Sequence, residues 1–110
     1  SRKADEAVQV MNGLWLGSKR DALNLEWQDK VGIRAILNLA SDDLVELHGK
    51  YPKSYRTLFV PAEDSEYPLL ERHLLDAFAF VESCISEVPI RPVLVHCVQG
   101  LNRSGTIVVA

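Results

Sequence analysis

The sequence VLVHCVQGLNRSG, residues 93–105, contains the pattern that decides the fold of this chain. It begins with an apolar run at 93–95, continues through a turn that contains Gly100, and is followed by a second apolar run at 106–110. A short apolar run bounded by turn signals is typical of a buried strand. The pattern therefore predicts a buried strand, a tight loop and the first turn of a helix, with Cys97 at the point where the strand becomes the loop.

This loop combines a cysteine and an arginine, Cys97 and Arg103, in a setting that suits phosphate chemistry. A cysteine attacks as its thiolate. The N–H groups of a loop that curls into a helix start stabilise such a thiolate and also bind an oxyanion. Gly100 allows a backbone conformation that a Cβ would obstruct, and an arginine stays charged while it grips two phosphate oxygens. We interpret residues 97–103 as a phosphate-binding loop around a reactive thiolate.

Five positions in this stretch, those of His96, Cys97, Gly100, Arg103 and Ser104, match the pattern HCxxGxxRS. The stretch resembles the signature loop of the protein tyrosine phosphatase superfamily and, within it, the dual-specificity branch. The resemblance implies that Cys97 is the nucleophile and that Arg103 holds the phosphate. It also implies that Ser104 helps the thiolate to leave and that His96 orders the loop instead of acting as a base. The implied phosphate-binding residues are Val98, Gln99, Gly100, Leu101, Asn102 and Arg103.

A second catalytic group is needed to protonate the leaving alcohol or phenol, and the stretch 59–66 offers three carboxylic acids. In dual-specificity phosphatases the acid is an aspartate on the loop that leaves a strand, and Asp64 matches in residue type and in its Val-Pro-Ala lead. Glu66 is the reserve candidate, and Glu63 is interpreted as a solvated neighbour. The alternative is that Asp64 only caps a turn before the next helix, as aspartates often do.

Outward from the loop, short apolar runs alternate with amphipathic segments. Strands are predicted at 8–10, 14–16, 35–39, 57–60 and 93–95, and helices at 19–30, 42–48, 68–87 and from 106 onward. In the helix at 68–87, six apolar residues recur at steps of three and four and are predicted to share one face. They are Leu70, Leu74, Phe78, Val81, Ile85 and Val88.

Strands that alternate with helices predict an α/β fold, in which helices flank a mostly parallel central sheet. The segments 11–18 and 32–39 are similar to the opening and central strands of dual-specificity domains, so the resemblance runs from about residue 8 to residue 110. We expect residues 1–110 to form one such catalytic domain. The run 107–110 shows no cap or breaker, and family domains continue with several more helices after the loop. We therefore expect helices beyond residue 110.

The amino-acid composition limits the kinds of molecule that this protein is expected to bind. With 47% hydrophobic and 25% charged residues, the 110-residue chain has the balance of a globular protein. Its formal charge of −3, with scattered lysines and arginines, gives no basic surface for nucleic acid or an anionic membrane. No apolar stretch is long enough to span a bilayer. We expect a phosphorylated protein substrate, and neither nucleic acid nor membrane as a partner.

The remaining cysteine and histidines are given structural roles. Cys84 lies beside the apolar face of the helix at 68–87 and is interpreted as a buried thiol, although some relatives pair a second cysteine with the nucleophile on oxidation. His48 and His73 have no partner at metal-ligand spacing and are interpreted as surface residues, so we expect neither metal nor cofactor. A reactive thiol without a disulfide framework indicates a reducing compartment, the cytosol or the nucleus.

Three other functions share parts of this pattern. An RNA 5′-triphosphatase of the same superfamily can have the Asn-Arg pair but lacks the aspartic acid and tends to be basic. A phosphoinositide phosphatase usually carries lysines in the loop, where this chain has none. A phospho-binding module without activity typically loses the cysteine or the arginine. Phosphotyrosine or phosphoserine/phosphothreonine hydrolysis on a protein substrate is the function that the sequence favours.

Overall fold

The computed structural model describes residues 7–40, 49–62 and 66–97. Five strands of this described part form a single sheet in the order β1-β2-β5-β3-β4. The strand β1 is antiparallel to β2, and the other three pairings are parallel. This arrangement confirms the predicted mostly parallel sheet. The strands are β1 (Val8–Met11), β2 (Leu14–Gly17), β3 (Ala35–Asn38), β4 (Arg56–Phe59) and β5 (Val93–His96).

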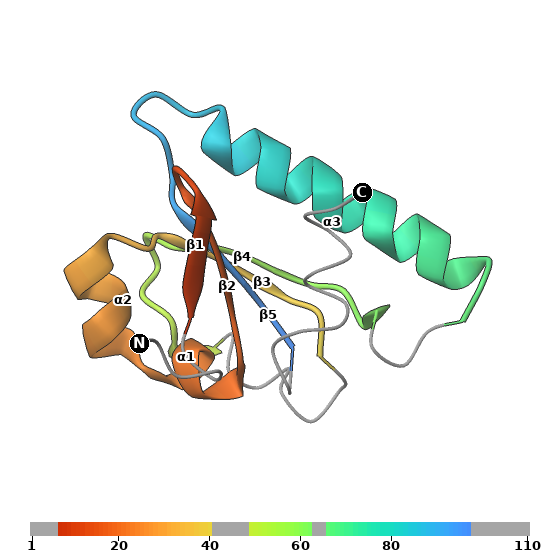
Figure 1. Ribbon diagram of the computed structural model, residues 1–110, viewed down its shortest axis with the longest axis horizontal. Helices are drawn as coiled ribbons and strands as arrows, with labels where there is room; N and C mark the ends of the chain where they lie inside the picture. The colour runs from red at the N-terminus through yellow and green to blue at the C-terminus, as the bar shows by residue number, and fades with distance from the viewer. Residues whose placement is uncertain (1–6, 41–48, 63–65, 98–110) are drawn as a thin grey trace.

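Helices cover both faces of the sheet (Figure 1). The long helix α3 (Leu69–Ile85) lies on one face, and the short helices α1 (Lys19–Leu23) and α2 (Leu25–Val31) lie on the other. Because side chains alternate between the faces of a strand, β2, β3 and β5 contribute side chains to two separate cores, one on each face of the sheet. The core on the α3 face contains Leu37, Val93, Val95, Val81 and Cys84. The core on the other face contains Ala22, Ile33, Ile36 and Leu94.

The two short strands predicted at 8–10 and 14–16 form a hairpin that turns at Asn12 and Gly13. Gly13 has a φ of 84°, a conformation that L side chains rarely adopt. A Cβ at this position would also lie 2.6 Å from Cδ1 of Ile90. The left-handed φ is the main reason for glycine here, and a Cβ would in addition push the end of the Ile90 side chain aside.

The single helix predicted at 19–30 is wrong, because the structure has two helices that meet at Asn24. This residue leaves helical geometry, with φ −95° and ψ 79°, and its side-chain Oδ1 accepts a hydrogen bond from the N–H of Trp27 at 3.0 Å. An asparagine that caps a new helix competes with continuation of the previous one. The second helix ends, as predicted, at Gly32, which has a φ of 90°.

The predicted buried face of the long helix is correct for Leu70, Leu74 and Val81 but wrong for Phe78 and Val88. Phe78 is 46% exposed, and Val88 lies beyond the helix end and is 97% exposed. The helix instead turns its small residues to the sheet, since Ala77 and Cys84 are fully buried. Small side chains let the helix axis approach the sheet, and Phe78, one position after Ala77, is rotated off that stripe by about 100°.

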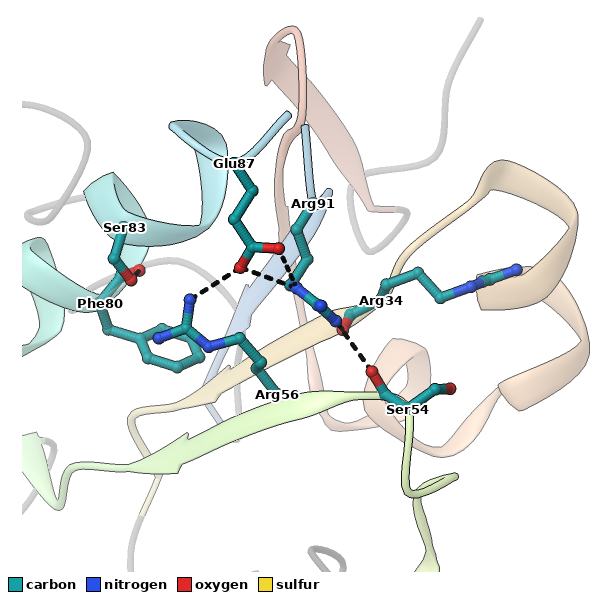
Figure 2. Close-up of polar contacts among 7 residues, drawn as sticks. All are labelled: Arg34, Ser54, Arg56, Phe80, Ser83, Glu87 and Arg91. Atoms are coloured by element: carbon teal, nitrogen blue, oxygen red, sulfur yellow. Dashed lines mark hydrogen bonds and ion pairs between the residues drawn. The ribbon is translucent and has the colours of Figure 1, made fainter. Parts of the chain in front are cut away.

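The amino ends of the parallel strands are joined by an ion-pair network centred on Glu87 (Figure 2). The Glu87 carboxylate accepts hydrogen bonds from Arg56 and from Arg91, each at 2.9 Å. Arg91 also donates to the backbone carbonyls of Arg34 at 3.2 Å and Ser54 at 2.8 Å. The guanidinium of Arg56 lies over the ring of Phe80, 5.2 Å from its centroid. The network therefore connects the end of α3 to the starts of β3, β4 and β5.

This network predicts an acid-sensitive component of stability. The hydrogen bonds from Arg56 and then Arg91 lower the pKa of Glu87 in the folded protein. Its stabilisation is therefore complete above the pKa of an unfolded glutamate and is lost as pH falls through the lower, folded pKa. We expect Glu87→Gln to be less stable than the wild type near neutral pH and to approach it only as pH falls below about 4.3, the pKa of an unfolded glutamate.

Urea unfolding at several pH values measures this effect. The control is Glu82→Gln, which alters an exposed glutamate in the last turns of α3, five residues before Glu87, and should leave the wild-type pH dependence in place. If Glu87→Gln and the wild type differed by the same amount at every pH, the assignment of this component to Glu87 would be wrong.

Candidate active site

The carboxyl ends of four parallel strands meet at one edge of the sheet, and β5 lies in the middle of them. His96, the last residue of β5, is in register with Gly17 on one side and with Asn38 on the other. Open parallel sheets bind their ligands outside this edge, near the middle of the sheet. Cys97 is the next residue, so the sheet places the predicted nucleophile at the centre of the edge.

The side chains of Cys97 and His96 belong to opposite faces of the sheet. Cys97 is 1% exposed and packs in the core on the α3 face, together with Leu39, Val60 and Ala62. His96 is fully buried, and the alternation along β5 assigns it to the face of α1 and α2. The prediction that His96 orders the loop is compatible with this position but remains a prediction.

The segment that leads to the predicted acid leaves the same edge. The N–H of Val60 donates to the carbonyl of Asn38 at 2.9 Å, and the N–H of Ala62 donates to the carbonyl of Val60 at 2.7 Å. Ala62 is fully buried in the core that also contains Cys97. The chain is therefore held beside β3, the neighbour of the nucleophile's strand, up to two residues before Asp64.

Most of the other predicted site residues lie outside the described residues. Glu66, the reserve acid, is described and exposed, and its carbonyl accepts a hydrogen bond from the N–H of Leu70 at the start of α3. The predicted site residues that lie outside are Glu63, Asp64, Val98, Gln99, Gly100, Leu101, Asn102, Arg103 and Ser104. The helices predicted at 42–48 and from 106 onward lie outside as well.

One residue at this edge was not singled out from the sequence. Asn38 is fully buried, and its Oδ1 accepts a hydrogen bond from the N–H of Ala40 at 2.8 Å. The available signal was a polar residue inside the apolar run 35–39, because an amide in a buried strand needs hydrogen bonds to offset its desolvation.

The second cysteine is a buried thiol, as predicted. Cys84 is fully buried in the core under α3, and desolvation raises the pKa of its thiol. A thiol that stays protonated is a poor nucleophile. Cys84 and Cys97 lie in the same core, but Cys84 is on a helix, whereas Cys97 directly follows the end of a strand.

Two negative findings apply to the described part of the chain alone. Within residues 7–40, 49–62 and 66–97, His, Cys, Asp and Glu side chains form no cluster of three or more that could hold a metal ion. None of the helices in these ranges has the length and apolar character needed to cross a membrane. His73, predicted to be a surface residue, is half-buried, and His48 lies outside the described residues.

Comparison with known proteins agrees with the fold. Residues 14–110 match the family model of the dual specificity phosphatase catalytic domain. The chain is 36% identical to human dual specificity protein phosphatase 9 over 110 residues and 36% identical to Xenopus laevis dual specificity protein phosphatase 22 over 103 residues. The crystal structure of human DUSP28 superimposes with a TM-score of 0.72 at 25% identity, covering 92% of this chain and 64% of that one.

The chain therefore belongs to the dual specificity phosphatase catalytic domain family. The match to the two curated relatives covers 98% and 93% of this chain but only 27% and 46% of their own lengths. This chain thus spans less than half of either relative.

The contrast between the two cysteines is testable by alkylation. In a Cys97→Ser background, where Cys84 is the only cysteine of the chain, iodoacetamide at neutral pH should leave Cys84 unmodified in the folded protein because its thiol is buried and protonated. Labelling of Cys84 is measured by mass spectrometry over a urea series, and global unfolding is measured by circular dichroism at the same urea concentrations. Labelling should rise together with unfolding. Rapid labelling of Cys84 without urea would contradict the assignment of an inert core thiol.

Proposed function

We propose that this protein is a protein phosphatase that hydrolyses phosphotyrosine, phosphoserine or phosphothreonine through a cysteinyl-phosphate intermediate. One observation carries the proposal. The cysteine of a complete HCxxGxxRS pattern directly follows the central strand of a parallel sheet, at the edge where such sheets bind ligands. Membership of the family supports the same reaction class.

The first step is attack of the Cys97 thiolate on phosphorus, which forms an S–P bond and breaks the P–O bond to the substrate. The backbone N–H groups of residues 98–103 are proposed to surround the phosphate, with Arg103 gripping two of its oxygens. In phosphoryl transfer the negative charge spreads over the equatorial oxygens. Amides and a guanidinium that are already aimed at these oxygens would stabilise the transition state.

The leaving oxygen is proposed to take its proton from Asp64. The support lies in the backbone before it, since Val60 is hydrogen-bonded to Asn38 at the end of β3, the strand next to β5, and Val60 and Ala62 belong to the core that contains Cys97. Glu66 is exposed at the start of α3, which makes it the weaker candidate. General acid catalysis by one such group typically contributes 10²–10⁴-fold.

The second step hydrolyses the cysteinyl-phosphate and regenerates the free enzyme. Water attacks phosphorus, its proton passes to the Asp64 carboxylate, and the S–P bond breaks to give inorganic phosphate and the Cys97 thiolate. The hydroxyl of Ser104 is proposed to stabilise the departing sulfur. The proposal includes a phosphorylated protein as the substrate and a reducing compartment, the cytosol or the nucleus, in which this thiolate would persist.

The nucleophile is tested by Cys97→Ser in the full-length protein. A serine hydroxyl is not ionised at neutral pH, so we expect hydrolysis of p-nitrophenyl phosphate to fall to below about one-thousandth of the wild-type rate. Binding of a phosphopeptide, measured by isothermal titration calorimetry, should persist because the amides and Arg103 remain. If the serine variant kept substantial turnover, the proposed function would have to be abandoned.

The acid is tested by Asp64→Asn with leaving groups of different quality. We expect kcat for an alkyl phosphate, a poor leaving group, to fall by about 10²–10⁴-fold, and kcat for an activated aryl phosphate to fall much less. Glu66→Gln is the matched control and should leave both rates near wild type. Loss of alkyl phosphate turnover in Glu66→Gln, with none in Asp64→Asn, would transfer the acid role to Glu66.

A further inference from the structure

Three residues form a row across the middle of the sheet, directly before the predicted active site. Gly17 on β2, His96 on β5 and Asn38 on β3 are in register with one another. Because side chains at the same register point to the same face of a parallel sheet, the side chains of His96 and Asn38 lie next to each other on the face of α1 and α2. The neighbour of His96 on β2 is Gly17, which has no side chain.

The amide of Asn38 holds the chain immediately after β3. Its Oδ1 accepts a hydrogen bond from the N–H of Ala40 at 2.8 Å. Ala40 is fully buried, so water cannot readily replace this acceptor. An asparagine that binds the N–H two residues ahead closes a local turn, and the backbone of residues 38–40 is thereby fixed.

The middle residue of this turn, Leu39, is hydrogen-bonded to the residue before the nucleophile. The N–H of Leu39 donates to the carbonyl of His96 at 2.8 Å. That carbonyl belongs to the peptide unit between His96 and Cys97. Because a peptide unit is planar, fixing the direction of its carbonyl also fixes the direction of the Cys97 N–H and the position of its Cα.

The same residue also holds the strand that leads to the predicted acid. The backbone carbonyl of Asn38 accepts a hydrogen bond from the N–H of Val60 at 2.9 Å. A single turn at the end of β3 therefore touches both segments on which catalysis would depend, the exit of β5 and the exit of β4.

On this basis, and resting on the proposed function, we propose that Asn38 is a positioning residue for the active site. Its side-chain amide sets the turn at 38–40, and this turn holds the His96–Cys97 peptide in the orientation that the nucleophile requires. An apolar residue could fill the same buried space, but it would leave the N–H of Ala40 without its acceptor, and an unsatisfied buried N–H is destabilising.

The chain offers a matched control in Gln28, a second fully buried amide on the same side of the sheet. Gln28 donates to the backbone carbonyls of Asp21 at 2.8 Å and Ala22 at 3.1 Å, and accepts from the hydroxyl of Tyr55 at 3.1 Å. None of these three partners belongs to β3 or β5. Loss of the Gln28 amide should therefore destabilise the fold without turning the peptide before Cys97.

The experiment uses full-length wild type, Asn38→Ala, Asn38→Ser and Gln28→Ala. Two readouts are taken under conditions in which each variant is folded: kcat/KM on p-nitrophenyl phosphate, and the pH dependence of iodoacetamide labelling of the Cys97 peptide by mass spectrometry. A displaced nucleophile would be less well stabilised as a thiolate, so its labelling should shift to higher pH.

We expect Asn38→Ala to lower kcat/KM by about 10–100-fold and to shift the labelling profile upward, since small displacements of reacting groups have effects of this order. Asn38→Ser, whose hydroxyl can still accept from an N–H two residues ahead, should be intermediate, and it serves alone if the alanine variant does not fold. Gln28→Ala should unfold at lower urea with both readouts unchanged.

Two results would overturn the assignment of Asn38. One is an Asn38 variant with wild-type kcat/KM and labelling profile, and the other is an equal shift in Gln28→Ala. Failure of the proposed function looks different, because the wild-type Cys97 would then label only in the pH range of an ordinary thiol and Cys97→Ser would keep turnover.

Discussion

The structure depends on one topological constraint, that the strand ending in Cys97 is paired on both sides by parallel strands. Four carboxyl ends then meet at a single edge, and β5 is held there by hydrogen bonds from β2 and from β3. A strand that is paired on both sides cannot slip without breaking hydrogen bonds to both neighbours. Its register with them therefore determines where the strand ends. The residue after its end is therefore presented at a defined point of the sheet.

Polar residues are placed to support this constraint at both ends of the strands. At the amino ends, the carboxylate of Glu87 binds two guanidinium groups, and Arg91 binds the carbonyls of residues 34 and 54. At the carboxyl ends, the amide of Asn38 binds the turn after β3. The half-buried ionic network loses strength in acid, whereas the buried amide has no charge to titrate. The sheet is thus stabilised by ionic contacts at the amino ends of its strands and by a neutral hydrogen bond at the carboxyl ends, beside the site.

Several local features could be predicted from the sequence because local chemistry determines them. Apolar runs gave the positions of the strands to within about one residue, and Gly13 and Gly32 marked a turn and a helix end where φ is positive. The errors arose where packing decided the outcome. Asn24 divides one expected helix into two, since its side chain caps the second. Phe78 and Val88 matched the apolar period but are exposed, because the helix approaches the sheet through Ala77 and Cys84.

The same division holds for the site. The sequence by itself determined which residue types are present and in what spacing, and this pattern predicts a thiol nucleophile, an arginine for phosphate and an acid within one chain. Only the tertiary structure decided that the strands carrying Cys97 and leading to Asp64 end at the same edge, with Asn38 between them. The physical reason is that these contacts join residues far apart in the chain. Their geometry is determined by strand order and register, and no short stretch of sequence encodes either.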